Sequence, residues 1–394
     1  MKYYLIAGEA SGDLHGSNLI KGLVETDPDA RFRFWGGEKM KDAWQQSRFP
    51  QEGDGLAMDY RQTAVMGISD VLKSLGKISR NLAFCKEDIQ QWQPDVVVLI
   101  DYPGFNLKMA RFAKEKGFKV FYYIAPKVWA SREGRIRQLK AYVDKLFIIF
   151  PFEIPYFTKK GIPFIYKGNP LIDAIDSSAA LAQSREAFFA AHNLPECRYV
   201  AILAGSRSGE IGRMMPVCME AVDRLAASHQ ALHFIVAGAP SRTKEDYRPY
   251  IGDRKNVHLV FNDTYGVLKN AECAIINSGT ASLEAALIGT PQVVGYRMSR
   301  LVPAWLARKF LKVKYISLGN LILDRLAFRE FIQSELKADA LLQELTRLVE
   351  DEPYRERMKA DYARIRELLG GSGASDAVAE AMIKDLFASL PQNM

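Results

Sequence analysis

Two stretches in the second half of the chain combine glycine, hydroxyl and ionic side chains directly after apolar runs. They read AILAGSRSGEI over residues 201–211 and IINSGTASLE over residues 275–284. In each, a predicted helix follows the loop, so backbone N–H groups gather where a phosphate binds well. Two such loops indicate a nucleotide held at the carboxyl ends of parallel strands. Ordinary strand–helix turns with capping residues are the alternative that the residues leave open.

The side chains of both loops suit a nucleoside diphosphate. Arg207 has a planar guanidinium that can hold a diphosphate through paired hydrogen bonds. Glu284 stands one turn inside the second helix, where a carboxylate can accept from two neighbouring ribose hydroxyls. The predicted donor-binding residues of the two loops are Gly205, Ser206, Arg207, Glu210, Ser278, Gly279, Thr280, Ser282 and Glu284.

Three acidic residues follow predicted strands in the first half. Asp101 ends the apolar run DVVVLID, where its surroundings favour a carboxylate that can take a proton from an alcohol. Glu9 and Asp13 stand in a loop predicted over 8–16, where they would repel a pyrophosphate but suit a sugar hydroxyl. Other interpretations stay open: Asp101 or Asp13 as a helix cap, and Glu9 as a solvated acid.

Other reaction classes lack their signatures. The chain has no HExxH, GxSxG or spaced His/Cys cluster, which argues against metallohydrolases and serine esterases. Its four cysteines show no CxxC spacing and are typical of reduced thiols without a zinc site. A net charge of +7 favours phosphorylated substrates or anionic lipid as partners. Nucleic acid is not expected, because no basic run interleaves with aromatic residues.

Strands alternate with helices along both halves, which predicts an α/β fold with parallel, helix-covered sheets. At 394 residues the chain exceeds what one core usually supports, and we expect two Rossmann-like domains facing a cleft, with a boundary at residue 171. Strands are predicted over 2–7, 31–35, 95–101, 119–124 and 145–150, and over 199–204, 232–237, 257–260, 274–276 and 292–295. Helices are predicted over 17–25, 82–91, 107–116, 172–189 and 337–386, the last broken at 370–373.

Two apolar segments could meet lipid. Residues 301–314, LVPAWLARKFLKVK, mix large apolar side chains with four basic ones, which fits an interfacial helix; a surface helix packed on its own domain is the alternative. Residues 65–68 and 71–72 could receive an acyl chain or pack in a core. No run is long enough to span a bilayer, so we expect a soluble or membrane-surface protein.

These motifs together resemble the lipid-A-disaccharide synthase family, glycosyltransferases of the GT-B type (family 19). The match runs in order over almost the whole chain. Its segments are AGEASGDLHG (7–16), WGG (35–37) with Met40, MGISDVL (66–72), PDVVVLIDYPGFN (94–106), YYIAPKVWASR (122–132), FPFE (150–153), KGNPLID (167–173), AGSRSGEI (204–211), SGTASLEAAL (278–287), GNLI (319–322) and EFIQ (330–333).

The chain departs from the family at a few positions. The family usually has Trp where Ser131 stands, Pro where Ala204 and Gly319 stand, and an acidic or small polar residue near Leu326. These changes concern loop shape and the preference for acyl chains or acceptor more than the type of reaction.

The resemblance implies a reaction in lipid A biosynthesis. UDP-2,3-diacylglucosamine would donate its sugar, with inversion, to the 6-hydroxyl of 2,3-diacylglucosamine 1-phosphate (lipid X), giving a β-(1→6) tetraacyl disaccharide 1-phosphate and UDP. It implies no metal and no cofactor, since the UDP-sugar is a substrate. It places the enzyme on the cytoplasmic face of the anionic inner membrane, and whether it forms a homodimer stays open.

The resemblance also implies roles for single residues. Asp101 would be the general base, with Glu9 and Asp13 positioning the sugar or assisting; which of these three acids is the base stays open in the sequence. The other implied acceptor-binding residues are Ser11, Gly12, His15, Met66 and Asn106, and Asn320 and Gln333 would join the donor side. Because the last helices of such folds return to the first domain, we expect domains of 1–171 with 374–394, and of 172–373.

Two rival functions fit the same loops. One is another GT-B enzyme acting on a UDP-sugar, an epimerase or a peptidoglycan-precursor transferase, which would not depend on acyl chains in both substrates. The other is a regulatory protein that binds a UDP-sugar without turnover.

Overall fold

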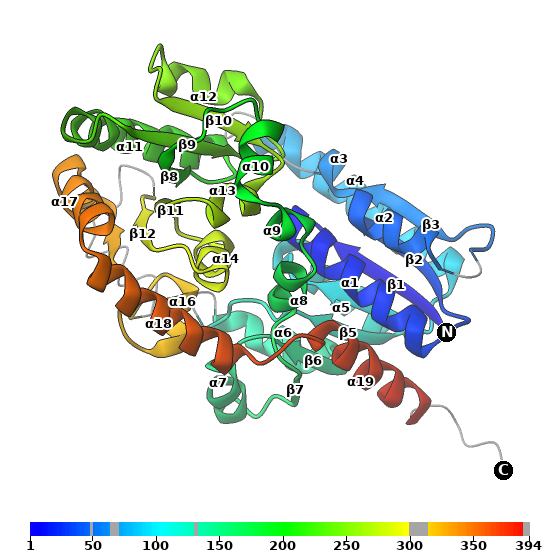
Figure 1. The fold of residues 1–394 in the computed structure, drawn as a ribbon. Coiled ribbons are helices and arrows are strands. Elements are labelled where there is room, and N and C mark those ends of the chain that lie inside the picture. The colour runs from blue at the N-terminus through cyan, green and yellow to red at the C-terminus, as the bar shows by residue number, and fades with distance from the viewer. Residues whose placement is uncertain (48–49, 64–70, 130–132, 299–313, 389–394) are drawn as a thin grey trace. The chain divides into compact units, whose positions relative to one another are not determined.

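The computed structural model describes the chain except for residues 48–49, 64–70, 130–132, 299–313 and 389–394 (Figure 1). The chain divides into two compact units. Unit 1 comprises Met1–Ala174 and Leu369–Met394, and unit 2 comprises Ile175–Leu368. Each unit is built around one parallel sheet. The predicted fold class, a GT-B fold of two α/β domains, is therefore confirmed in that each unit has its own parallel, helix-covered sheet.

The sheet of unit 1 has the order β3-β2-β1-β4-β5-β6-β7. All its pairings are parallel, and β1 lies between β2 and β4, so the direction of strand addition reverses there. In such sheets ligands bind at the carboxyl ends of the strands beside this reversal. The strands are β1 (Lys2–Ala7), β2 (Arg31–Gly36), β3 (Gly55–Asp59), β4 (Val96–Ile100), β5 (Lys119–Tyr123), β6 (Lys145–Ile148) and β7 (Phe164–Tyr166).

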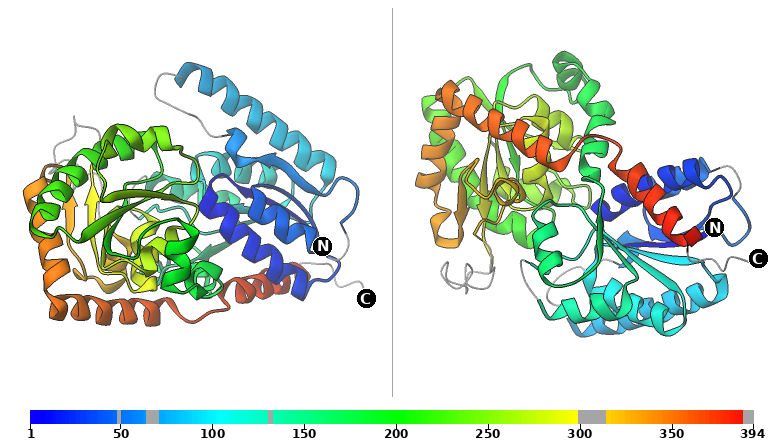
Figure 2. Two further views of the ribbon diagram at one scale, coloured as in Figure 1. Left: turned by 45° about the horizontal axis from the view of Figure 1, so that its top comes forward. Right: turned by 90° about the horizontal axis from the view of Figure 1, so that it is seen from below.

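Helices cover both faces of this sheet (Figure 2). On one face α1 packs against α2 and α19, so the end of the chain returns to its beginning; on the other α4, α5 and α6 pack together. The helices of unit 1 are α1 (Ala10–Thr26), α2 (Glu38–Gln45), α3 (Tyr60–Thr63), α4 (Val71–Trp92), α5 (Pro103–Glu115), α6 (Ile136–Tyr142), α7 (Glu153–Lys159), α8 (Pro170–Asp176, which runs on into unit 2) and α19 (Ala374–Ala388).

The sheet of unit 2 has the order β10-β9-β8-β11-β12-β13, again all parallel with the reversal at the first strand. Its strands are β8 (Arg198–Leu203), β9 (Leu232–Gly238), β10 (Val257–Phe261), β11 (Cys273–Asn277), β12 (Gln292–Tyr296) and β13 (Glu330–Ile332). Its helices are α9 (Ala179–Ala182), α10 (Arg185–Ala191), α11 (Ser208–Ser228), α12 (Lys244–Ile251), α13 (Thr264–Lys269), α14 (Thr280–Ile288), α16 (Leu318–Leu323), α17 (Ala338–Glu350) and α18 (Glu352–Leu369, whose last residue belongs to unit 1).

The loop predicted over residues 8–16 is wrong, because α1 already begins at Ala10. Its glycines serve packing instead. A Cβ atom on Gly12 would lie 3.1 Å from the Cβ of Ala7, and one on Gly16 would lie 2.6 Å from the sulfur of Met40. The missing side chains let α1 lie close to β1 at Gly12 and to α2 at Gly16. In the sequence alone, such a glycine-rich run looks like a loop.

The helical connection predicted over 172–189 is divided into three separate helices, α8, α9 and α10. Of the two segments predicted to meet lipid, residues 65–70 and 301–313 lie outside the described residues. Within the described part of the chain, no helix has both the length and the apolar character needed to cross a bilayer.

Candidate active site

Asp101 stands directly after β4, beside the reversal point of the sheet in unit 1. It and Tyr102 both have left-handed backbones, with φ of 44° and 47°. The Asp101 N–H donates to the carbonyl of Tyr123 at 3.1 Å. Its carbonyl accepts from Asn106 Nδ2 at 2.8 Å and from the Tyr122 hydroxyl at 2.6 Å. The backbone of the predicted base is thus held on both sides.

Burial raises the pKa of the Asp101 carboxyl above its ordinary value. The positive charge of Lys127 opposes this shift, while the negative charge of Glu9 adds to it. Glu9 is the exposed N-cap residue of α1. A partly buried carboxylate whose proton affinity has been raised is suited to general-base work. The structure therefore places Glu9 close enough for its charge to act on Asp101.

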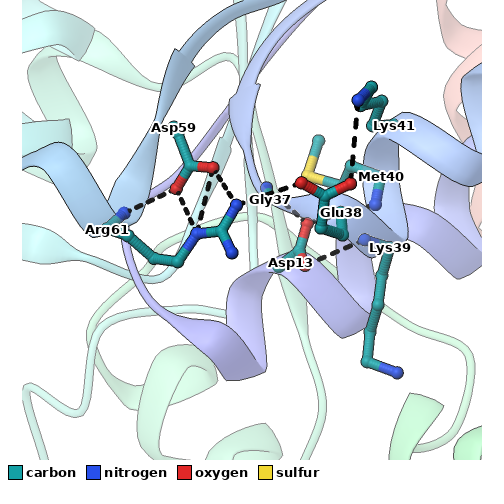
Figure 3. A network of polar contacts seen from close by, with 8 residues as sticks. All are labelled: Asp13, Gly37, Glu38, Lys39, Met40, Lys41, Asp59 and Arg61. Atoms are coloured by element: carbon teal, nitrogen blue, oxygen red, sulfur yellow. Dashed lines mark hydrogen bonds and ion pairs between the residues drawn. The ribbon is translucent and has the colours of Figure 1, made fainter. Parts of the chain in front are cut away.

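Asp13 acts as a helix cap, one of the two interpretations that the sequence leaves open for it (Figure 3). Only 4% of it is exposed. Its Oδ1 accepts from the N–H groups of Gly37 at 2.6 Å and Met40 at 3.1 Å, and its Oδ2 from Lys39 at 3.2 Å. These N–H groups open α2 and have no partner within that helix. Asp13 therefore caps α2 through both of its oxygens, and its predicted part in catalysis stays a prediction.

The neighbourhood of Asp13 is itself tightly built. A Cβ atom on Gly37 would lie 2.7 Å from Asp13 Oδ2, so only glycine lets this carboxylate approach the start of α2. Beside it, Arg61 binds the carboxylates of Asp59 and Glu38, which ties the end of β3 to the first turn of α2 (Figure 3).

The predicted acceptor-binding residues separate into exposed and buried ones. Ser11 is exposed in the first turn of α1, next to Glu9. Gly12 is buried, and so is His15, whose Nδ1 has no hydrogen-bond partner among the described residues and whose pKa burial lowers to about 4. Asn106 is completely buried. The acceptor contacts implied for these three buried residues stay predictions, and Met66 lies outside the described residues.

In unit 2 the first loop leads from β8 into α11. Gly205 has a φ of 112°, and a Cβ atom there would lie 2.6 Å from Glu210 Oε2. The same oxygen accepts from the N–H groups of Ser206 at 3.0 Å and Arg207 at 3.3 Å, while Oε1 pairs with the Arg207 guanidinium at 3.0 Å. An anionic oxygen therefore already occupies two of the backbone donors predicted for a diphosphate. Glu210 acts as part of a capping box.

Sequence reasoning missed Arg242, which follows β9 and reaches the same loop. Its Nε donates to the Ser206 carbonyl at 3.2 Å and its Nη1 to the Ser208 hydroxyl at 2.6 Å. The available signal was a third strand followed by a glycine- and serine-containing loop, AGAPSR over 237–242. This loop places a second guanidinium at the start of α11.

The second loop leads from β11 into α14. Ser278 donates its N–H to the Gly295 carbonyl at 2.9 Å, and the buried Ser282 hydroxyl donates to the Gly279 carbonyl at 2.9 Å. Gly279 is the exposed N-cap residue and Thr280 the first residue of α14. Ser282 therefore stabilises the turn, and its predicted contact with the donor stays a prediction.

Glu284 lies on α14 where the sequence predicted it. Its Oε1 accepts from the Tyr265 hydroxyl at 3.0 Å, and burial raises the pKa of the carboxyl. Tyr265 belongs to α13 and was not predicted, because nothing in the local sequence links it to α14. A tyrosine that orients a carboxylate is what a hydroxyl-binding site requires.

Asn320 and Gln333 are both buried. Asn320 uses its whole amide: Nδ2 donates to the Phe328 carbonyl and to Glu330 Oε1, and Oδ1 accepts from the N–H of Ala327. The side chain closes the loop before β13, and its predicted contact with the donor stays a prediction. Gln333 accepts from the Met298 N–H at 2.6 Å and also lies inside unit 2.

A model of the lipid-A-disaccharide synthetase family matches residues 3–382. The chain belongs to this family. It is 36% identical to the lipid-A-disaccharide synthase of Geobacter metallireducens over 384 residues, which cover 97% of this chain and 96% of that one. It is 35% identical to the synthase of Myxococcus xanthus over 381 residues, or 96% of each.

Among solved structures, the chain is similar to UDP-GlcNAc 2-epimerase from Neisseria meningitidis bound to UDP-GlcNAc. The TM-score is 0.72 at 15% identity, covering 98% of this chain and 100% of that one. At this identity the likeness shows the fold alone. The matched family, with relatives aligned over nearly their whole length, therefore favours the synthase over the rival epimerase.

Glu153, the last residue of the family segment FPFE, is a further buried carboxylate of unit 1. Glu153 is 1% exposed and accepts from Trp129 Nε1 at 3.0 Å and from the N–H groups of Ile149 and Phe150. Burial raises its pKa to about 7. It joins the loops that follow β5 and β6 and fixes the indole of Trp129.

Proposed function

We propose that this chain transfers 2,3-diacylglucosamine from its UDP derivative to the 6-hydroxyl of 2,3-diacylglucosamine 1-phosphate. The product is the β-(1→6) tetraacyl disaccharide 1-phosphate, and UDP leaves. The observation that carries the proposal is the placement of Asp101, a carboxylate of raised pKa at the reversal point of a parallel sheet, in a member of the lipid-A-disaccharide synthetase family.

The reaction needs one displacement. Asp101 accepts the proton of the acceptor hydroxyl while the oxygen of that hydroxyl attacks the anomeric carbon of the donor sugar. The bond from this carbon to the diphosphate breaks, and its electron pair leaves with UDP. A single attack inverts the configuration, so no enzyme nucleophile is required. Glu9 and Ser11, both exposed beside Asp101 at the start of α1, hold hydroxyls of the acceptor sugar.

Unit 2 carries the donor. The Arg207 guanidinium and the Ser206 hydroxyl stabilise the charge that grows on the leaving UDP, and each well-placed donor can supply roughly 3 kcal/mol. Glu284, oriented by Tyr265, accepts from the ribose hydroxyls. Since cationic side chains and helix N-termini supply this stabilisation, we propose that transfer needs no bound metal.

We also propose that the protein works at an anionic membrane surface. Both substrates are acylated, and the net charge of +7 favours approach to anionic lipid.

The test is a micelle assay with UDP-diacylglucosamine and labelled diacylglucosamine 1-phosphate in the presence of a chelator. Chromatography and mass spectrometry follow the labelled lipid. The expected result is a tetraacyl disaccharide phosphate formed in equal amount to UDP. Epimerised UDP-GlcNAc in a parallel reaction, with no disaccharide, would instead identify the rival epimerase. UDP binding without either product would identify a non-catalytic binding protein.

A further inference from the structure

Backbone strain is concentrated at the predicted base. Among the described residues, non-glycine positive φ angles occur at a few isolated positions, but Asp101 and Tyr102 adopt them in succession. Side chains disfavour this conformation, and it persists only where surrounding contacts enforce it. Whatever enforces it also sets the direction in which the Asp101 carboxylate leaves the backbone.

One enforcing contact comes from Tyr122 on β5. Its ring is completely buried, and its hydroxyl donates to the Asp101 carbonyl at 2.6 Å. Burial, with the nearby charge of Asp101, raises the pKa of this hydroxyl well above its ordinary value. It therefore stays protonated, and stays a donor, at any pH at which the enzyme works.

The second contact comes from Asn106 on α5. Its Nδ2 lies among three backbone carbonyls: Asp101 at 2.8 Å, Ile100 at 3.2 Å and Ile6 at 3.3 Å. Only the nitrogen end of the amide can face three acceptors, so the orientation of the side chain is determined. Its buried Oδ1 accepts no hydrogen bond from the described residues. An amide that leaves its own oxygen unsatisfied is retained for the bonds made by its nitrogen.

We propose that Tyr122 and Asn106 are positioning residues that hold the carbonyl of Asp101 and thereby aim its carboxylate at the acceptor hydroxyl. Neither touches substrate. This inference rests on the proposed function, in which Asp101 is the base. It replaces the acceptor contact that the sequence predicted for Asn106. It also assigns a role to Tyr122, the first residue of the family segment at 122–132, for which the sequence predicted none.

Tyr122→Phe is the sharper test, because it removes one hydroxyl and keeps the buried ring. Tyr123→Phe is the matched control: Tyr123 is the next residue of β5, is equally buried, and points to the opposite face of the sheet. Asn106→Leu is a second variant, whose folding must first be checked by circular dichroism because its amide also joins β1 to β4.

We expect Tyr122→Phe to lower kcat about tenfold or more, since small misplacements of a reacting group cost that much. KM for both substrates and the affinity for UDP should change less than twofold, and Tyr123→Phe should match the wild type. In an Asp101→Ala background, Tyr122→Phe should have no further effect on the residual rate, because it acts only through Asp101.

Three outcomes overturn the inference. The first is a Tyr122→Phe enzyme as active as the wild type. The second is an equal loss from Tyr122→Phe in the Asp101→Ala background. The third is a crystal structure of Tyr122→Phe in which Asp101 and its carboxylate have not moved. That structure decides the question even if wild-type protein makes no disaccharide, an outcome that would refute the proposed function separately.

Discussion

Asp13 distinguishes a structural carboxylate from a catalytic one, and a pair of substitutions can separate the two roles. Asp13→Ala removes the acceptor for three N–H groups at the start of α2, two of them in buried hydrogen bonds. At about 1 kcal/mol net for each bond, and more where the acceptor is charged, unit 1 should lose about 3–4 kcal/mol of unfolding free energy. Asp13→Asn can keep Oδ1 and the bonds from Gly37 and Met40, so its loss should be about 1–2 kcal/mol.

The charge of Asp13 modifies these figures. Burial raises the pKa of the folded carboxyl above its unfolded value, and the backbone N–H groups only partly offset this shift. A carboxyl with a raised folded pKa binds its proton more tightly in the folded state. Its contribution to stability is therefore fully present below the unfolded pKa and declines as pH rises through the folded pKa. Ionisation of Asp13 above its folded pKa thus subtracts from its stabilising contribution, a cost that neutral Asn does not carry.

The assay is urea unfolding followed by circular dichroism, with kcat measured on the folded variants at saturating substrate. Glu38→Gln is the matched control, because it removes an exposed charge at the start of the same helix and should cost less than about 1 kcal/mol. An Asp13→Asn enzyme of wild-type stability that loses turnover by orders of magnitude would refute the capping role and restore Asp13 to the chemistry.

Three other predictions follow from the same geometry. Asp101 must be ionised to act, so kcat/KM should fall as the pH drops through its raised pKa. Glu9→Gln should move this acid limb of the pH profile to lower pH, and Lys127→Met should move it to higher pH. A shift of the limb in the same direction for both variants would contradict the assignment of Asp101 as the base. Tyr265→Phe should weaken UDP binding about three- to tenfold by calorimetry, since it frees the carboxylate of the ribose site, and unchanged affinity would place the ribose elsewhere. Gly16→Ala should lower stability to thermal unfolding by about 1–3 kcal/mol, because its Cβ would approach a methionine sulfur to 2.6 Å, and an unchanged melting temperature would show that the contact can relax.

All but one of the strands that the sequence predicted lie inside their sheets; the exception is β10, at one edge of the unit 2 sheet. β4 reads VVVLI and is entirely buried, so an apolar run alone identifies it. β3 and β7 lie at the edges of the unit 1 sheet, β13 lies at an edge of the unit 2 sheet, and their residues are largely half-buried. Edge strands carry weaker periodicity than central ones, and these three were missed.

The candidate site was predictable where a position along one strand determines the role. Asp101 directly follows the buried strand β4, and Glu284 lies on the helix after the buried strand β11, so both positions were predictable; their roles stay predictions. Asp13 and Asn320 could not be assigned in this way, because their side chains bond to backbone groups of other segments. Asp13, for example, accepts from N–H groups that lie about one helix and one strand further along the chain. A polar residue near a strand end looks the same in sequence whether it faces substrate or caps a neighbouring helix.

The most direct test of the account is the rate of disaccharide formation by Asp101→Asn, an almost isosteric variant that cannot accept the proton. Wild-type and variant protein are compared at saturating concentrations of both acylated substrates, with UDP affinity measured in parallel. The account predicts a fall in kcat of about 10²–10⁴-fold, the usual contribution of a general base, with UDP affinity unchanged. Turnover within tenfold of the wild type would contradict it and would require another group to take the proton.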